Sequence, residues 1–395
     1  MKRTLLTIIL LAAAAWGVHG QETLLLGNAE RTALYLDPGR IWNYNHYEHS
    51  RWGLGLRLVT HPQRFIFNKI DASAYLGYGL HDQQWKGGIG LSEHERGSRL
   101  NGVFYQRAMR DFRASGSRRI ANPWNEGGQL LGDFMARRMT DEHSITIGHR
   151  WHTARWRWAV EATWGKRGWL FDENRLLFLG TDNISYANFL HLRLLLRHNC
   201  GVSAMLEAAP DGSMARLLAD YRRNIPLGFF ALDIFAQAGI TPEQNEYIDM
   251  FDLGGMWGAP VYTGHSLITA RPNEFTTNAF ALLNLRFQTA KPLNKIYSPL
   301  FNVGSNPVPF VAFNAVWGML WNQDANGQLP WRSTFLQAPN RGIVEPTAGV
   351  NGLIRFGLVD WGLAFTYRYV PSSAPYHFSP ESSNFVLLVT ASLIP

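Results

Sequence analysis

The stretch that decides the fold is residues 359–369, whose sequence reads VDWGLAFTYRY. Side chains alternate between the two faces of an extended strand, so this stretch has a large apolar face and a small polar face. The apolar face carries Trp361, Leu363, Phe365, Tyr367 and Tyr369. The polar face carries Asp360, Gly362, Ala364, Thr366 and Arg368. Trp and Tyr at both margins of an apolar strip are typical of strands that cross a bilayer, because their amphipathic rings lie at headgroup level. The stretch therefore predicts a transmembrane β-strand.

The same alternation recurs along the chain, for example in residues 51–60, 157–166 and 186–197. In the last of these, leucines on one face alternate with His191 and Arg193 on the other. Segments of the ~10 residues that a tilted crossing needs recur roughly 16 times. We therefore predict an all-β fold, a transmembrane antiparallel β-barrel of roughly 16 strands, whose closure pairs every sheet edge.

The N-terminus has the features of an export signal. Lys2 and Arg3 precede an apolar run over residues 5–16, and we predict a cleaved signal peptide at residues 1–20. A retained anchor is the alternative, but the run is shorter than the ~20 apolar residues that a span needs. We expect an N-terminal periplasmic connector at residues 21–47 and an outer-membrane β-barrel at residues 48–395. The predicted location is the outer membrane of a Gram-negative cell.

Composition narrows the class of protein further. A single cysteine, Cys200, excludes a secreted fold held by internal disulfides. Aromatic residues make up 13% of the chain and include 15 Trp, which favours two girdles in contact with outer-membrane lipid. The net charge is +7, but the arginines are scattered and form no patch, so we expect no nucleic-acid partner. A basic lumen would favour anions.

The connections are unequal in length. We predict a long surface loop at residues 111–126, short turns at residues 140–142 and 210–212, and a large irregular segment at residues 240–274. This last segment is expected to fold inward. Its candidate inward residues are Leu253, Gly254, Gly255 and Trp257.

Charged side chains on the predicted polar faces are the candidate functional residues. We expect ten to face the lumen: Arg57, Arg150, Arg157, Glu161, Arg193, Arg197, Asp233, Arg286, Asp360 and Arg368. They have two interpretations, a wall stiffened by pairing across the lumen and an ion-selective pore. His149 and His152 lie on opposite strand faces and cannot share an ion, so we expect no metal. We predict no catalytic residue and no cofactor, although a rim cluster of His81, Asp82 and His94 leaves an enzyme as an alternative.

Four short stretches carry a resemblance to a known family: YNHYE at 44–48, AYLGYGLHD at 74–82, NAFALLNLRF at 278–287 and LNKI at 293–296. They resemble the C-terminal outer-membrane barrel of a Bacteroidetes-type family of unknown function, usually fused to a carboxypeptidase-regulatory-like domain. That barrel is distantly similar to surface-antigen and outer-membrane assembly-factor barrels. FDLGG at 251–255 looks like the segment that precedes the inward-folded loop of those barrels, but no Arg-Gly-Tyr or Arg-Gly-Phe triplet follows it here.

The resemblance implies a role in protein or lipid transport or biogenesis at the outer membrane, with insertion by the barrel assembly machinery and a client still unknown. Two alternatives remain open. One is a passive, weakly anion-selective porin-like channel, and the other is a rim-located barrel enzyme or surface anchor.

Overall fold

The computed structural model describes residues 23–28, 30–37, 41–45, 49–61, 67–95, 99–111, 139–169, 187–242, 250–253, 267–270, 275–294, 296–298, 303–321, 337–356, 359–371, 378 and 383–393. Within these ranges the regular structure is entirely β-strand. The described residues hold no helix with the length and apolarity needed to cross a membrane. The chain divides into two compact units: unit 1 comprises residues 1–112, 119–199 and 204–215, and unit 2 comprises residues 113–118, 200–203 and 216–395.

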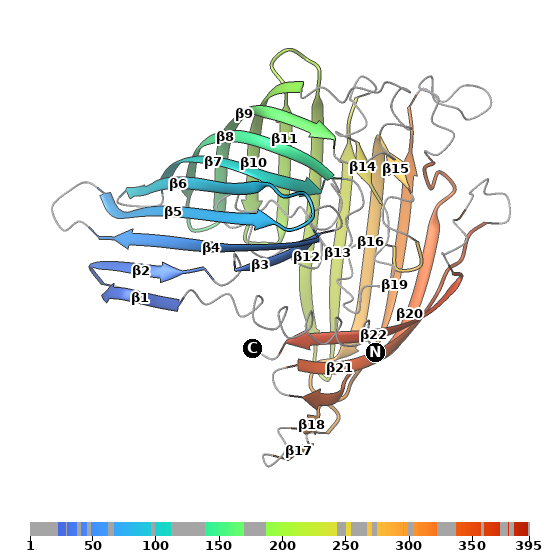
Figure 1. The fold of residues 1–395 in the computed structure, drawn as a ribbon. Helices are drawn as coiled ribbons and strands as arrows, with labels where there is room; N and C mark the ends of the chain where they lie inside the picture. The colour runs from blue at the N-terminus through green and yellow to red at the C-terminus, as the bar shows by residue number, and fades with distance from the viewer. Residues whose placement is uncertain are drawn as a thin grey trace. The chain divides into compact units, whose positions relative to one another are not determined.

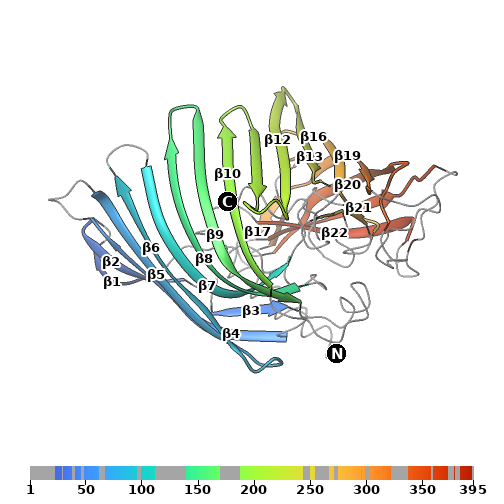
Figure 2. The ribbon, with the colours of Figure 1, turned by 90° about the horizontal axis from the view of Figure 1, so that it is seen from above.

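Unit 1 is built from antiparallel strands that pair in chain order. They are β1 (Thr23–Asn28), β2 (Thr32–Leu36), β3 (Trp42–Asn45), β4 (His49–Thr60), β5 (Phe67–Gly79), β6 (Trp85–Glu95), β7 (Arg99–Asp111), β8 (Met139–His152), β9 (Trp156–Trp169), β10 (Ala187–His198) and most of β11 (Val202–Ala208). β2 pairs with β1 and β4, β3 also pairs with β4, and each strand from β4 to β9 pairs with the next. Figures 1 and 2 show β5 to β9 as long strands lying side by side.

Unit 2 is a second run of antiparallel strands. They are β12 (Ala215–Leu227), β13 (Phe230–Ile240), β14 (Phe251–Asp252), β15 (Thr276–Thr277), β16 (Ala279–Thr289), β17 (Ile296–Ser298), β18 (Val303–Ser305), β19 (Val308–Met319), β20 (Ile343–Phe356), β21 (Val359–Tyr367) and β22 (Phe385–Leu393). The pairing order is β12–β13–β16–β19–β20–β21–β22, and β18 joins β17 to β20. β14 and β15 form a separate pair, which Figure 1 draws close to β13 and β16.

Each strand has the two faces that the sequence predicts. In β21, Leu363 and Phe365 are 44% and 51% exposed, whereas Ala364 and Thr366, which alternate with them, are 0% exposed. In β10, Leu192 and Leu194 are exposed and His191 is buried. We call the side with the exposed aliphatic and aromatic residues the apolar face and the opposite side the polar face. A sheet that exposes its large apolar residues and covers its polar ones reverses the usual arrangement of a water-soluble fold.

The predicted all-β, antiparallel class is confirmed, and 15 of the 22 described strands are seven residues or longer. The stretch before residue 48 differs from expectation, because parts of the predicted connector form β1, β2 and β3. Thr32 to Leu36 of β2 pair in register with Leu56 to Thr60 of β4, so backbone pairing gives this stretch a regular structure. Between β16 and β19 in the chain, β17 and β18 form a further short antiparallel pair.

The predicted turn at residues 140–142 is wrong. These residues belong to β8, which pairs with β7 on one side and β9 on the other as far as Thr140. Asp141 is 2% exposed and Glu142 is 9% exposed. Their polarity suggested a solvated turn, but pairing with two long neighbours extends the strand through them. Beyond Asp111, the predicted surface loop lies outside the described residues.

The predicted turn at residues 210–212 is confirmed. The Ala209 N–H donates to the Met214 carbonyl at 2.7 Å, and Gly212 has a φ of +76°, which glycine adopts without strain. The Asp211 carboxylate accepts hydrogen bonds from the Ser213 hydroxyl at 2.7 Å and the Ser213 N–H at 3.0 Å. These bonds lower the pKa of Asp211 below its usual value.

Candidate functional site on the polar face of the two units

The polar face of unit 1 carries a row of basic and acidic side chains, which we call the charge ladder: Arg150, Glu161, Arg193, Glu207 and His191. Arg150 Nη2 donates to Glu161 Oε1 at 2.9 Å, and Arg193 Nη1 lies 3.5 Å from Glu161 Oε2. Arg193 also donates to Glu207 Oε1 at 3.1 Å, and His191 Nδ1 lies 3.2 Å from the same oxygen. Each carboxylate is therefore shared by two neighbours.

The period of the strands explains this arrangement. Glu161 on β9 is directly opposite Arg193 on β10 and directly opposite Gly148 on β8. Glu161 and Glu207 are only 1% and 2% exposed. A buried carboxylate without a partner is costly, so the arginines that reach each one across the strands offset its desolvation. The ion pairs of the ladder thus hold these neighbouring strands in one register.

Two further ion pairs lie on the same face of unit 1. Arg57 on β4 makes a forked contact with Asp71 on β5, with Nε 2.9 Å from both carboxylate oxygens. Lys86 is 1% exposed and donates to Asp82, four residues earlier in the chain. The first pair has the fork geometry in which arginine binds carboxylates most strongly. In both pairs, as in the ladder, a basic side chain is paired with an acidic one.

In unit 2 a segment between β13 and β16 covers part of the polar face. We call its described parts, residues 250–253, 267–270 and 275–278, the inward segment. Phe251, Leu253, Leu267 and Phe275 are each 0–1% exposed. Leu253 N–H donates to the Phe275 carbonyl at 2.9 Å, and the Phe251 ring lies 4.9 Å from that of Phe280 on β16. The segment therefore has a packed, apolar contact with the sheet.

Glu345 on β20 is the main polar anchor of the inward segment. Its carboxylate accepts the backbone N–H groups of Ile268 and Thr269, both at 2.8 Å, and the Thr269 hydroxyl at 2.5 Å. Asn314 on β19 donates to the same carboxylate at 3.0 Å. Glu345 is 0% exposed. Four donors to one buried carboxylate fix both the position of the segment and the orientation of the side chain.

Arg368, which follows β21, makes a second attachment. Its Nη1 donates to the Thr269 carbonyl at 3.3 Å, and its Nε and Nη2 donate to Asn384 Oδ1 at 3.0 and 2.7 Å. The guanidinium also lies 3.4 Å from the centroid of the Phe378 ring. Thr269 is thus held on its N–H, hydroxyl and carbonyl by two different residues of the sheet.

Two glycines on the polar face leave room for the inward segment. A Cβ on Gly239 of β13 would lie 2.7 Å from Phe251 Cζ, and one on Gly318 of β19 would lie 2.4 Å from Thr277 Cγ2 and 3.0 Å from Leu253 Cδ1. Such distances are shorter than van der Waals contact allows. Any larger residue at either position would push against the segment.

The structure brings three predicted residues together in the charge ladder, namely Arg150, Glu161 and Arg193. The others lie outside the ladder. Arg57 pairs with Asp71, Arg286 lies opposite Asp233 with its guanidinium 4.1 Å from the Phe310 ring centroid, and Asp360 lies opposite Arg355. Arg157 and Arg197 lie opposite one another and are exposed. Leu253 lies in the inward segment, whereas Gly254, Gly255 and Trp257 lie outside the described residues.

The site prediction missed Asp71, Glu207, Asn314 and Glu345. All four occupy polar-face positions of segments that were predicted as strands, so the period of two contained the signal. The partners could not be read from it, because Glu345 binds residues 76 and 77 positions away in sequence. Among the described residues, no group of three or more His, Cys, Asp or Glu side chains is placed to hold a metal ion.

Comparison with known proteins adds evidence on the fold. No protein-family model and no curated protein matches the sequence. Among solved structures, the chain is similar to BamA from Haemophilus ducreyi lacking POTRA domains 1–3, with a TM-score of 0.50 and 13% identity, over 89% of this chain and 69% of that chain. It also matches CdiB from Escherichia coli, with a TM-score of 0.47 and 12% identity, over 93% of this chain and 64% of that chain. At such identities the likeness to BamA supports the β-barrel fold alone, and the closer resemblance to a Bacteroidetes-type family stays a prediction.

Proposed function

We propose that this chain is an integral β-barrel of the Gram-negative outer membrane. Support comes from the apolar face of β10, where four leucines at positions 190–196 lie between Asn188 and His198. Ten residues of antiparallel strand span ~34 Å, which a tilt of about 40° reduces to ~26 Å, close to the ~25 Å apolar band of outer-membrane barrels. On β9, Trp164 lies opposite Leu190 and Trp158 opposite Leu196. Indole rings thus mark both margins of the band.

The organisation proposed with it keeps the boundaries predicted from the sequence. Residues 1–20 are a cleaved export signal and residues 48–395 the barrel, inserted by the barrel assembly machinery and surrounded by outer-membrane lipid. Residues 21–47 are the N-terminal periplasmic connector, part of which joins the sheet where β2 pairs with β4. Short turns of such barrels are periplasmic and long connections extracellular. β12 and β13 are joined by Gly228 and Phe229 alone, so the inward segment, at the opposite end of β13, enters from the extracellular side.

The role that we propose is protein or lipid transport or assembly at the outer membrane. The observation that carries it is the inward segment, which is buried on the polar face and anchored by three hydrogen bonds to Glu345. A passive pore needs an open polar lumen, whereas the inward segment occupies part of the polar face with a specific, hydrogen-bonded structure. A structured segment held on the polar face suits a protein that handles a large client better than one that passes small ions.

The charge ladder is also evidence against an anion-selective channel. An anion-selective channel requires positive charges that face the permeant ion without carboxylates beside them. Here Arg57, Arg150 and Arg193 each lie within 3.5 Å of a carboxylate. Such pairing favours the interpretation of these residues as a stiffened wall. We therefore rank the weakly anion-selective channel and the rim enzyme below the transport or assembly role.

Two measurements on the full chain test this proposal. In planar bilayers, the purified protein is expected to give no steady conductance, and depletion in the native host is expected to lower the amounts of other outer-membrane proteins or of surface lipid. Re-expression of the natural chain should restore them, and a Glu345→Ala chain should restore them less well. A steady anion-biased current, together with an unchanged outer-membrane composition after depletion, would establish the passive channel instead.

A further inference from the structure

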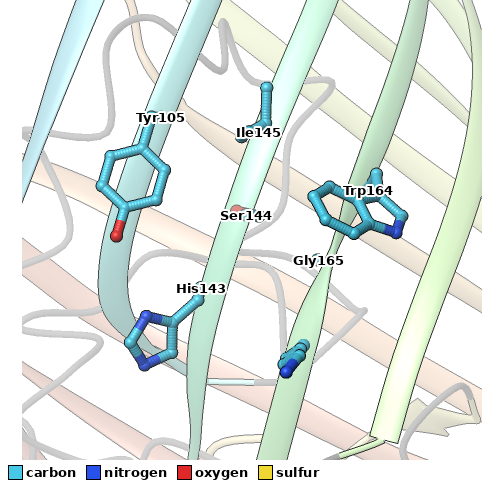
Figure 3. Close-up of a pocket in the computed structure, with 7 residues that line it drawn as sticks. Tyr105, His143, Ser144, Ile145, Trp164 and Gly165 are labelled. Carbon is cyan, nitrogen blue, oxygen red and sulfur yellow. The ribbon is translucent and has the colours of Figure 1, made fainter.

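The apolar face of unit 1 has a groove that crosses three strands. It measures about 490 Å³ and is lined by Tyr105 of β7, by His143, Ser144 and Ile145 of β8, and by Trp164, Gly165 and Lys166 of β9. Figure 3 shows the rings of Tyr105, His143 and Trp164 around it, with Ser144 and Gly165 between them. Ser144 and Gly165 are buried and lie opposite one another, so the backbone of β8 and β9 forms the floor.

The groove has a polar end and an apolar end. His143 and Lys166 lie directly opposite one another on β8 and β9, and Lys166 is exposed. Two residues along the strands, Ile145 lies opposite Trp164, and Trp164 is 56% exposed. Tyr105 is directly opposite Ile145 on the other side. Lys166 and the His143 ring therefore stand at one end of the groove, and Ile145 and Trp164 at the other. Tyr105 belongs to the row of Ile145, and Figure 3 shows its hydroxyl directed toward the His143 end.

We infer that this groove binds an anionic membrane lipid, with the headgroup phosphate at Lys166 and the start of an acyl chain along Ile145 and Trp164. The inference rests on the proposed membrane location, because it places Lys166 at the margin of the apolar band. Trp164 marks that margin, and headgroups lie at the same depth as the Trp and Tyr girdles. A lysine at headgroup level attracts anionic lipid phosphates, and the phenol of Tyr105 supplies a hydrogen-bond donor.

The shape of the groove favours a lipid over a soluble phosphate. Its apolar end belongs to the same exposed surface as Ile147 and Val160, which are 58% and 47% exposed. A small anion would leave this end against water or lipid tails, whereas a lipid fills both ends with matching chemistry. The polar end is on the side of the long connection between β9 and β10, so the lipid belongs to the outer leaflet under the proposed orientation.

The experiment uses the full-length protein in phosphatidylcholine nanodiscs that contain a minor fraction of spin-labelled phosphatidylglycerol. The measured quantity is the relative association of phosphatidylglycerol over phosphatidylcholine with the protein. Lys166→Gln should lower this preference about fivefold, the effect of one cation near a membrane surface, and Lys166→Arg should retain it. Lys291→Gln, at another exposed lysine outside the groove, is the matched control and should leave the preference unchanged.

The outcomes separate this inference from the proposed function. An unchanged preference in Lys166→Gln, or an equal loss in Lys291→Gln, overturns the lipid site while a heat-modifiable, inserted protein leaves the membrane proposal standing. Displacement of the labelled lipid by an equal concentration of soluble glycerol phosphate also overturns the lipid site, because it shows a small-anion site. Failure of the natural chain to enter nanodiscs overturns the membrane location and the lipid site with it.

Discussion

Replacing Glu345 with alanine should release the inward segment from the polar face. The substitution removes the acceptor for the N–H groups of Ile268 and Thr269 and for the Thr269 hydroxyl, all within 2.8 Å in the natural protein. It also deprives Asn314 of a partner. In the buried position these donors find no replacement, since alanine offers none, whereas in the released position water satisfies them.

The magnitude follows from the desolvation of those donors. Each buried polar group left without a partner costs ~1–3 kcal/mol, and because the costs of neighbouring groups do not add, we expect ~3–5 kcal/mol in total for the four donors. At ~1.4 kcal/mol for each factor of ten, the released population should rise by roughly two to four orders of magnitude. Glu345→Gln retains one oxygen acceptor and should have a smaller effect.

A cysteine at position 270 reports the release. Ala270 is 0% exposed, so a thiol there should react slowly with a water-soluble maleimide in a Cys200→Ser background. Glu345→Ala should accelerate the reaction at least tenfold. Glu207→Ala, which removes a buried carboxylate of the charge ladder instead, should leave the rate unchanged. A rate in Glu345→Ala within twofold of the natural protein would refute the reasoning that Glu345 anchors the segment.

Three other substitutions probe the remaining features. Glu161→Gln removes the charge that Arg150 and Arg193 share and should lower the free energy of unfolding by ~2 kcal/mol, measured by urea titration in lipid vesicles; an unchanged midpoint would deny the ladder a stabilising role. Ile147→Arg, on the apolar face, should cost ~2–4 kcal/mol in the same assay if that face meets lipid, against ~0.5 kcal/mol or less at a surface in water. Gly318→Val should collide with Thr277 and accelerate labelling at position 270; equal rates would mean that the segment does not depend on this gap.

The strand pattern was predictable because it is local. In β10 and β21 the side chains alternate with a period of two, and that period alone assigns Leu192 and Leu363 to one face and His191 and Thr366 to the other. Leu195 interrupts the pattern, since it is an apolar residue on the polar face, yet it is buried at 5% exposure. The alternation of the neighbouring residues therefore predicts the face that Leu195 occupies better than its own hydrophobicity does.

The failures have a different physical origin. The polar residues of β8 near Asp141 suggested a turn. This prediction failed because a single sequence does not reveal that two neighbouring strands pair along the whole of β8. In the same way, Glu345 appeared only as one more polar-face position. Its role comes from Ile268 and Thr269, which the fold returns to the sheet from a distant part of the chain. Long-range contacts of this kind are set by tertiary packing and are absent from the local period.

The central claim is that the apolar face of the strands meets hydrocarbon and the polar face does not. Spin labels placed one at a time at positions 190–195 of β10, in protein reconstituted into lipid vesicles, test it through relaxation by oxygen, which partitions into lipid, and by a water-soluble nickel complex. Labels at positions 190, 192 and 194 should relax mainly with oxygen, and labels at positions 191, 193 and 195 should respond weakly to it. Preferential relaxation by the nickel complex at positions 190, 192 and 194, or no alternation at all, would contradict the account.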